Sequence, residues 1–258
     1  MNLIKFPGLN LEFNISKVAF EVFGIKIYWY AILIVTAIIL ALIIFRKRNG
    51  LYDIRFNDIL DLSLYAIPIA IVCARLYYII FNLEYYMQNP KEILSIRNGG
   101  LAIYGAIIGG LITLIIFCKK KKINVLDLID YVAPGLVLGQ AIGRWGNFVN
   151  VEAYGTTTNS FLRMGIIESG KYIEVHPTFL YESIACFAIF IILLLMKNKR
   201  KFKGQIACTY FILYSLERFF VEGLRTDSLM LGNIRISQIL SAIIFIVSLT
   251  FYIIRSER

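Results

Sequence analysis

Long apolar runs separated by short polar segments dominate the pattern of this 258-residue chain. A helix needs about 20 mostly apolar residues to cross a bilayer, and seven runs are long enough. They cover roughly residues 23–45, 57–82, 99–118, 125–148, 178–196, 204–222 and 233–254. The pattern predicts an all-α polytopic membrane protein with seven transmembrane helices, forming a single integral membrane domain over residues 1–258. Composition agrees, because 59% of the residues are hydrophobic and 17% are charged, which is unusual for a soluble domain.

Two segments outside these runs indicate β-structure. Residues 9–15 alternate apolar and polar side chains, which is typical of a short strand. In the segment 149–177, Ser169 and Gly170 lie between apolar and β-branched residues, as in a hairpin turn. We therefore expect 149–177 to form a small extracytoplasmic head element, a β-containing cap on the outer face.

The positive charges gather at alternate ends of the predicted helices. One side collects more than half of the 27 lysines and arginines: Arg46, Lys47, Arg48, Arg55, Lys119 to Lys122, Lys197, Lys199, Arg200, Lys201, Lys203, Arg255 and Arg258. The other side carries Lys5, Lys17, Lys91, Arg97, Arg163, Lys171 and Arg225. By the positive-inside rule the N-terminus lies outside and the C-terminus in the cytoplasm. This placement explains the net charge of +10 without a nucleic-acid partner.

Polar side chains are concentrated in the outer halves of five predicted helices. Ionisable residues at that depth cost about 2.5–3.5 kcal/mol each on insertion scales and usually face the interior of a helix bundle or a wet cavity. They are Tyr30, Arg75, Tyr104, Arg144, Tyr214, Glu217, Arg218 and Glu222. Their common depth predicts a polar site that opens to the outer leaflet.

Helical spacing places several of these residues on shared faces. Residues three and four apart are neighbours on a helix, which groups Gln140, Arg144 and Asn147 on one helix. The same spacing groups Tyr214, Arg218, Glu222 and Arg225 on another. Two arginines facing one pocket suit a phosphate, because guanidinium binds it bidentately. The alternative is that Arg144 and Arg218 form structural ion pairs with Glu152, Glu217 or Glu222.

The sequence GRWGNFVNVEAYG (143–155) resembles the signature of the bacterial prolipoprotein diacylglyceryl transferase family. Residues that match the family pattern are Gly143, Arg144, Gly146, Asn147, Phe148, Asn150, Glu152 and Gly155. Further similarity lies in YWYA (28–31), GGLAIYG (99–105), HPTFLYES (176–183) and YSLERFFVEGLR (214–225). The resemblance therefore extends over most of the chain.

The resemblance implies an enzyme of the bacterial plasma membrane whose active site faces the outer leaflet. It would transfer the diacylglyceryl group of phosphatidylglycerol to the lipobox cysteine of a prolipoprotein, forming a thioether and releasing glycerol phosphate. Arg144 and Arg218 would hold the phosphate and stabilise the leaving group. Substrate binding is expected of Tyr30, Asn147, Asn150, Glu152, Gly155, Tyr214, Glu222 and Arg225. The resemblance implies no cofactor.

Tyr104 departs from the pattern, because many members of the family have histidine at this position. A tyrosine hydroxyl ionises near pH 10 and is a poor base at neutral pH unless neighbouring arginines acidify it. Tyr104 is retained as a catalytic candidate, while the phosphate or Glu152 are alternative acceptors of the thiol proton. The sole histidine, His176, precedes a proline and is interpreted as the start of a helix.

Three other classes of protein were compared with the transferase. A transporter or flippase for an anionic lipid could use the same outer arginines, but it should need polar groups reachable from both sides. The inner half offers chiefly Asp58 and Asp61. A membrane scaffold would not need polar groups at one depth. A metal enzyme is disfavoured, because one histidine and scattered carboxylates form no ligand cluster in the sequence.

Overall fold

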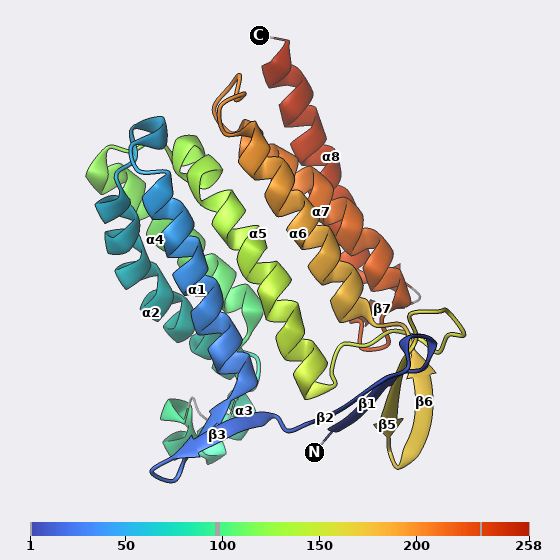
Figure 1. Cartoon of the computed structure of the whole chain (residues 1–258). Coiled ribbons are helices and arrows are strands. Elements are labelled where there is room, and N and C mark those ends of the chain that lie inside the picture. Colours follow the sequence, from blue (N-terminus) through green and yellow to red (C-terminus); the bar gives the residue numbers. More distant parts are fainter. Residues whose placement is uncertain (1, 96–98, 233, 258) are drawn as a thin grey trace. The chain divides into compact units, whose positions relative to one another are not determined.

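The computed structural model describes residues 2–95, 99–232 and 234–257. Two compact units are formed, residues 1–44 with 132–258, and residues 45–131. The long helices are α1 (Trp29–Lys47), α2 (Phe56–Ile80), α4 (Ile103–Lys121), α5 (Val125–Asn150), α6 (Thr178–Met196), α7 (Gln205–Leu224) and α8 (Ile236–Ser256), and Figure 1 labels them. Shorter ones are η1 (Pro7–Leu9), η2 (Leu51–Asp53), α3 (Leu83–Gln88) and η3 (Pro90–Leu94). Arg97 and Arg258, two of the basic residues behind the predicted orientation, lie outside the described residues.

Membrane-spanning length and apolarity are found in six helices of the described chain: α1, α2, α4, α5, α6 and α8. The run predicted at 204–222 does form a helix, α7. Its last turns carry Glu217, Arg218 and Glu222, and these charges separate α7 from the six. The six helices of membrane-spanning length confirm the multi-pass membrane class.

A four-stranded antiparallel sheet lies in the first unit. Its strands are β1 (Asn2–Phe6), β2 (Leu11–Ile15), β5 (Met164–Glu168) and β6 (Lys171–Val175), in the order β2-β1-β5-β6. The predicted hairpin is confirmed, since β5 and β6 are joined at Ser169 and Gly170, both with positive φ. The predicted strand at 9–15 is β2. Ile4, Phe6 and Ile166 of this sheet pack in one core with Phe148 and Phe179, which fixes the end of α5 and the start of α6 to the sheet.

Two further hairpins correct the predicted ends of the apolar runs. β3 (Val18–Val22) pairs with β4 (Ile25–Tyr28), and β7 (Met230–Leu231) pairs with β8 (Ile234–Arg235). Residues 23–28 were expected in the first transmembrane helix, but they belong to the β3–β4 turn and to β4. The expected start at 99 is also wrong, because Gly99 and Gly100 have positive φ and α4 begins at Ile103. β-structure therefore extends beyond the predicted cap.

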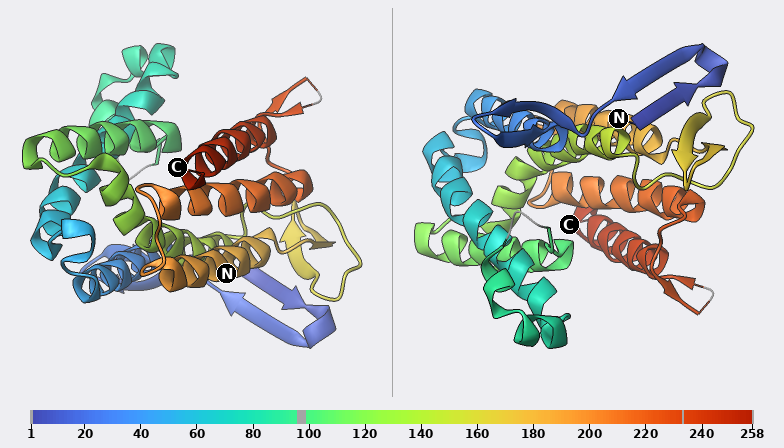
Figure 2. Two further views of the ribbon diagram at one scale, coloured as in Figure 1. Left: turned by 90° about the horizontal axis from the view of Figure 1, so that it is seen from above. Right: turned by 90° about the horizontal axis from the view of Figure 1, so that it is seen from below.

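Helix α7 packs against both α6 and α8. Both views in Figure 2 show α7 between these two apolar helices. It begins after Gly204, whose φ of 90° turns the chain into the helix. α7 is therefore flanked by two helices of transmembrane length, and its charged turns have protein neighbours to face.

The second unit is built on the close pairing of α2 and α4. A Cβ on Gly105 would lie 2.3 Å from the carbonyl oxygen of Cys73, and one on Gly109 would lie 2.7 Å from the Cys73 Cβ. Only glycine permits this approach of the two backbones. Arg75 of α2 donates hydrogen bonds to the carbonyl oxygens of Glu92, Ile93, Gly99 and Gly100. It thereby joins α2 to η3 and to the two glycines that precede α4.

Candidate active site

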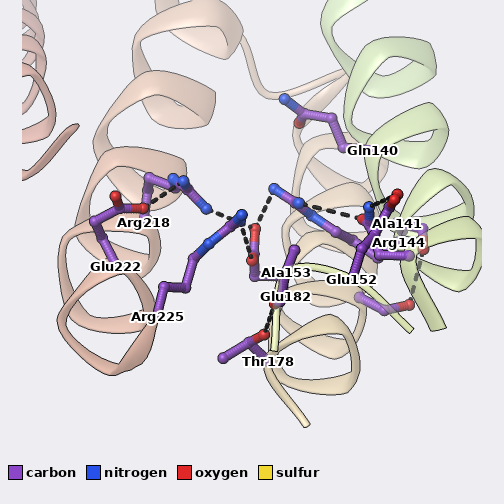
Figure 3. Close-up of polar contacts among 12 residues, drawn as sticks. Gln140, Ala141, Arg144, Glu152, Ala153, Thr178, Glu182, Arg218, Glu222 and Arg225 are labelled. Carbon is purple, nitrogen blue, oxygen red and sulfur yellow. Dashed lines mark hydrogen bonds and ion pairs between the residues drawn. The ribbon is translucent and has the colours of Figure 1, made fainter. Parts of the chain in front are cut away.

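Glu182 is the centre of an arginine cluster in the first unit (Figure 3). Its side chain is 1% exposed, and it lies in the second turn of α6. Arg144 of α5 pairs with Oε2. Arg218 Nη1 of α7 lies 3.2 Å from the same oxygen, and Arg225 Nη1, directly after α7, lies 3.6 Å from Oε1. One buried carboxylate thus gathers three arginines: one from α5, one from α7 and one directly after α7.

Two further carboxylates hold Arg218 and Arg225. Glu222 pairs with Arg218 one helical turn away. Asp227 accepts two hydrogen bonds from Arg225, from Nε at 2.9 Å and from Nη2 at 2.8 Å. Burial alone would lower the pKa of Arg225, but the hydrogen bonds and charge of Asp227 outweigh it and raise that pKa. In turn, the hydrogen bond from Arg225 lowers the pKa of Asp227.

The predicted helical face of α7 is confirmed by this arrangement. Arg218, Glu222 and Arg225 lie together as their spacing of four and three residues requires. Tyr214, on the same predicted face, stacks its ring on Tyr210 with centroids 5.5 Å apart. The Tyr210 hydroxyl in turn donates to Gln140 of α5 at 3.2 Å. These aromatic contacts join α7 to the helix that carries Arg144.

Asn147 connects Arg144 to Glu152. The Arg144 Nη1 donates to the Asn147 Oδ1 at 3.4 Å, and the Asn147 Nδ2 donates to the Glu152 Oε1 at 2.8 Å. Asn150 donates to the same Glu152 oxygen at 3.4 Å. Glu152 is therefore held by the two amides of the signature, and no ion pair between Glu152 and Arg144 is found in the described structure.

Gly155 fixes the chain beside the end of α7. It forms a β-bridge with Arg225, its N–H donates to the His176 carbonyl at 3.0 Å, and Thr156 N–H donates to the Leu224 carbonyl at 2.8 Å. A Cβ at position 155 would lie 2.7 Å from the His176 Cβ and 3.1 Å from the Leu224 oxygen. The glycine is thus required by a close approach that positions Arg225.

Tyr30 lies at the start of α1 and packs on α5. A Cβ on Gly146 would lie 2.2 Å from the Tyr30 ring, so the glycine of the signature makes room for this tyrosine. The Tyr30 ring therefore lies against α5 at Gly146, which stands between Arg144 and Asn147 in the sequence. The structure thus brings together Tyr30 and the signature helix, as a lipid site built on α5 would require.

Tyr104 and Arg75 belong to the second unit. Tyr104 is the second residue of α4, 39% exposed, with its ring 6.3 Å from that of Tyr77. Its catalytic role remains a prediction.

In the first unit His176 Nδ1 lies 3.3 Å from the Tyr181 hydroxyl, and α6 begins at Thr178, two residues after His176. The interpretation of His176 as the start of a helix is confirmed.

Sequence reasoning missed Glu182, the residue on which the cluster converges. Of the proposed structural ion pairs, the one with Glu222 is confirmed, whereas the partner shared by both arginines is Glu182. The available signal was its isolation, because it is the single acidic or basic residue in the apolar run 178–196. An ionisable residue in such a run marks a functional site by default.

The cluster has the partly exposed guanidinium groups expected of an anion site. Arg144 and Arg218 keep 20% and 18% of their side chains exposed, while Glu182 is buried beneath them. Guanidinium groups held by carboxylates on one side still present N–H donors on the other. A phosphate could therefore be bound from the exposed side without dismantling the cluster.

These features define a multi-pass membrane protein with an arginine-rich site in its helices. Comparison with known sequences assigns its family. A sequence model of prolipoprotein diacylglyceryl transferase matches residues 17–254. The phosphatidylglycerol–prolipoprotein diacylglyceryl transferase of Finegoldia magna is 52% identical, covering 90% of this chain and 92% of that protein. Those of Clostridioides difficile and Bacillus cytotoxicus are 50% and 46% identical, covering 88% and 95% of this chain and 90% and 93% of theirs.

The chain belongs to the prolipoprotein diacylglyceryl transferase family. It is a diacylglyceryl transferase enzyme, and the resemblance seen in the sequence is confirmed.

Proposed function

We propose that this enzyme transfers the diacylglyceryl group of phosphatidylglycerol to the lipobox cysteine of prolipoproteins, the first step of lipoprotein maturation. The relatives named for these two substrates support the proposal. The observation that carries it is the convergence of Arg144, Arg218 and Arg225 on Glu182. Phosphatidylglycerol is an anionic lipid, and partly exposed arginines bind a phosphodiester through charge-assisted hydrogen bonds.

In the proposed reaction the cysteine sulfur attacks the carbon of the diacylglyceryl group that is bonded to the phosphate oxygen. A carbon–sulfur bond forms, the carbon–oxygen bond breaks with its electron pair on oxygen, and glycerol phosphate leaves with one additional negative charge. Arg144 and Arg218 stabilise that charge as it develops. The thiol proton has two acceptors among the groups named above, the departing phosphate and Glu152. Tyr104 is proposed as a hydrogen-bond donor, from its position in the family motif.

The residues around the arginines are proposed to shape the lipid site. Asn147 and Asn150 orient Glu152 through their side-chain amides. Tyr30 covers Gly146 of α5, and Glu222 pairs with Arg218 on α7. Tyr214 stacks on Tyr210, which donates to Gln140 of α5. Gly155 positions Arg225 through the β-bridge. Each of these residues therefore has a contact that acts on an arginine or on the signature helix.

We also propose that α7 is a seventh transmembrane helix. It packs between α6 and α8, and its charged residues pair with Glu182 and with one another. Such pairing lowers the cost of placing charges at membrane depth. With seven crossings the basic last turns of α1, α4 and α8 all face the cytoplasm. The N-terminus, the head element 149–177 and the site then face the outer side of the bacterial plasma membrane.

The test is an assay of the purified protein in detergent with phosphatidylglycerol and a lipobox peptide. Peptide mass and released glycerol phosphate are followed for the wild type, Arg144→Ala and Arg46→Ala, whose arginine is exposed at the end of α1. We expect a cysteine-dependent diacylglyceryl mass shift that is lost in Arg144→Ala and kept in Arg46→Ala. Bound lipid without any mass shift in the folded wild type would favour the transporter hypothesis.

A further inference from the structure

The β3–β4 hairpin ends in an exposed aromatic turn. Phe23 and Gly24 join the two strands with φ of 50° and 78°, so both turn residues adopt positive φ, as in the tight turns of hairpins. Phenylalanine is uncommon in this conformation, and the Phe23 side chain is 100% exposed. A large apolar side chain is therefore presented at the tip with no cover from the described protein.

One face of the hairpin is apolar as well. Phe20 pairs with Ile27 and Val22 pairs with Ile25, and paired residues share a face. Phe20 and Ile25 are 53% and 52% exposed. Between these pairs, Glu21 lies opposite Lys26 on the other face. The hairpin is therefore amphipathic, with an apolar face and a face that carries a pair of opposite charges.

The hairpin lacks support from other strands. Among the described residues β3 and β4 pair only with each other. An isolated two-stranded hairpin is marginally stable in water, and a contiguous exposed apolar surface marks a membrane or protein contact. Something outside the hairpin must therefore cover its apolar face.

The connection of the hairpin to α1 indicates what covers its apolar face. Tyr28 ends β4 and Trp29 begins α1 without a loop, and the Trp29 N–H donates to the Lys17 carbonyl at 3.1 Å. The base of the hairpin is thus fixed to the first residue of a helix that can span the membrane. Tyrosine and tryptophan are the residues enriched at the membrane–water interface. The tip lies about 13 Å further along β4, within reach of the lipid head groups.

We propose that the β3–β4 hairpin binds the surface of the membrane, with Phe23 and the Phe20 face inserted at the boundary between head groups and acyl chains. The Glu21–Lys26 face remains in water. The proposal rests on the membrane character of α1, and it uses the proposed orientation only to name the outer leaflet. The apolarity of the hairpin also explains why residues 23–28 were assigned to the first transmembrane helix from the sequence.

The experiment is a fluorescence depth measurement on the full chain in phosphatidylglycerol-containing liposomes. An environment-sensitive label is attached to Phe23→Cys and, as a matched control on the charged face of the same hairpin, to Lys26→Cys. Wild type treated with the same label corrects for the four native cysteines, of which three are buried. Quenching is compared between nitroxide-labelled lipid and aqueous iodide.

The label at position 23 should be quenched by nitroxide lipid and protected from iodide, and the label at position 26 should show the reverse. Equal iodide quenching at the two positions would overturn the proposal. Iodide quenching at position 23 that disappears on addition of a lipobox peptide would overturn it too and assign the surface to the peptide. Neither readout depends on transfer activity, so failure here is distinct from failure of the proposed function.

Discussion

The Arg218 Nη1 lies 3.2 Å from the Glu182 Oε2, and Arg144 pairs with the same oxygen. A single carboxylate oxygen therefore sets the separation of the two arginines that we propose for the phosphate. Glu182 can contribute to catalysis without contacting the lipid, because it positions the guanidinium groups before the lipid binds. Preorganised charge of this kind is a common source of catalytic power.

Replacing Glu182 by glutamine should therefore cost both stability and activity. The substitution keeps the shape of the side chain but leaves the arginines without their shared countercharge. Breaking a buried ion pair from one side costs about 3–5 kcal/mol, and we expect the partial exposure of the arginines to reduce this. Thermal unfolding in detergent and the peptide mass assay measure the two effects. Glu84→Gln, at an exposed position in α3, is the control. An unchanged melting temperature and rate in Glu182→Gln would contradict the positioning role.

Gly155→Ala should disturb the site through the backbone. The new methyl group would lie 2.7 Å from the His176 Cβ and 3.1 Å from the Leu224 oxygen, so the segment must move away from the end of α7. Overpacking of this kind costs about 1–3 kcal/mol, and we expect weaker transfer because Arg225 shifts. Gly139→Ala is the matched control, since nothing lies within 4 Å of its added Cβ. Equal stability and activity of the two variants would show that the approach at Gly155 is not required.

Much of the helical framework was predictable from the sequence, because transmembrane length and hydropathy leave little choice. The β5–β6 hairpin was also predictable, since Ser169 and Gly170 supply its turn. The start of α1 was not. Strand residues such as Phe20 and Ile25 are as apolar as a membrane helix, and hydropathy does not separate a surface-bound hairpin from the helix that follows it.

The arginine cluster was predictable only in part. The residue spacing predicted which face of α5 or α7 each arginine occupies. The partner of Arg144 depends in addition on how α5 and α6 are rotated about their axes and on the membrane depth at which each helix begins. A sequence pattern contains neither quantity. The isolation of Glu182 in its apolar run indicated a site without indicating which residues it binds.

Tyr104 is expected to act as a hydrogen-bond donor. Tyr104→Phe removes only the hydroxyl, so the transfer rate should fall severely, whereas Tyr104→His keeps a polar group, the one that the family resemblance leads us to expect here, and should retain activity. Rates with phosphatidylglycerol and a lipobox peptide measure both variants. Tyr65→Phe, which removes an exposed hydroxyl from α2, controls for general effects. Equal rates for Tyr104→Phe and the wild type would exclude this role.

The head element should lose stability in strong alkali. The hydrogen bond from Tyr154 to the Glu168 carboxylate, with some burial, raises the pKa of Tyr154 to about 12, above the ordinary value of about 10. The folded state thus favours the neutral hydroxyl. Its contribution is complete below pH ~10 and is lost as the pH rises through about 12. Difference titration at the tyrosinate absorbance, wild type minus Tyr154→Phe, gives the value directly. Glu168→Gln should return the titration toward the ordinary range, and a wild-type transition near 10 would rule out the bond.

Glu217 lies near the arginine cluster around Glu182 but takes part in none of the ion pairs described above. Both of its oxygens are buried and have no hydrogen-bond partner within the described part of the chain, and it interacts electrostatically with Glu182, Arg144 and Arg218. A buried carboxylate without a hydrogen bond is costly because it has lost its hydration, and an apolar residue of similar volume avoids that cost. Glu217→Leu should therefore raise the melting temperature in detergent.

Glu217→Ala, which removes the same charge but leaves a cavity, should gain less than Glu217→Leu. This comparison separates the two causes, because removal of the charge is common to both variants and only the packing differs. A lower melting temperature in both variants would show that the carboxylate stabilises the arginines across the α7 surface. In that case Glu217, and not only Glu182, would offset the positive charge of the site.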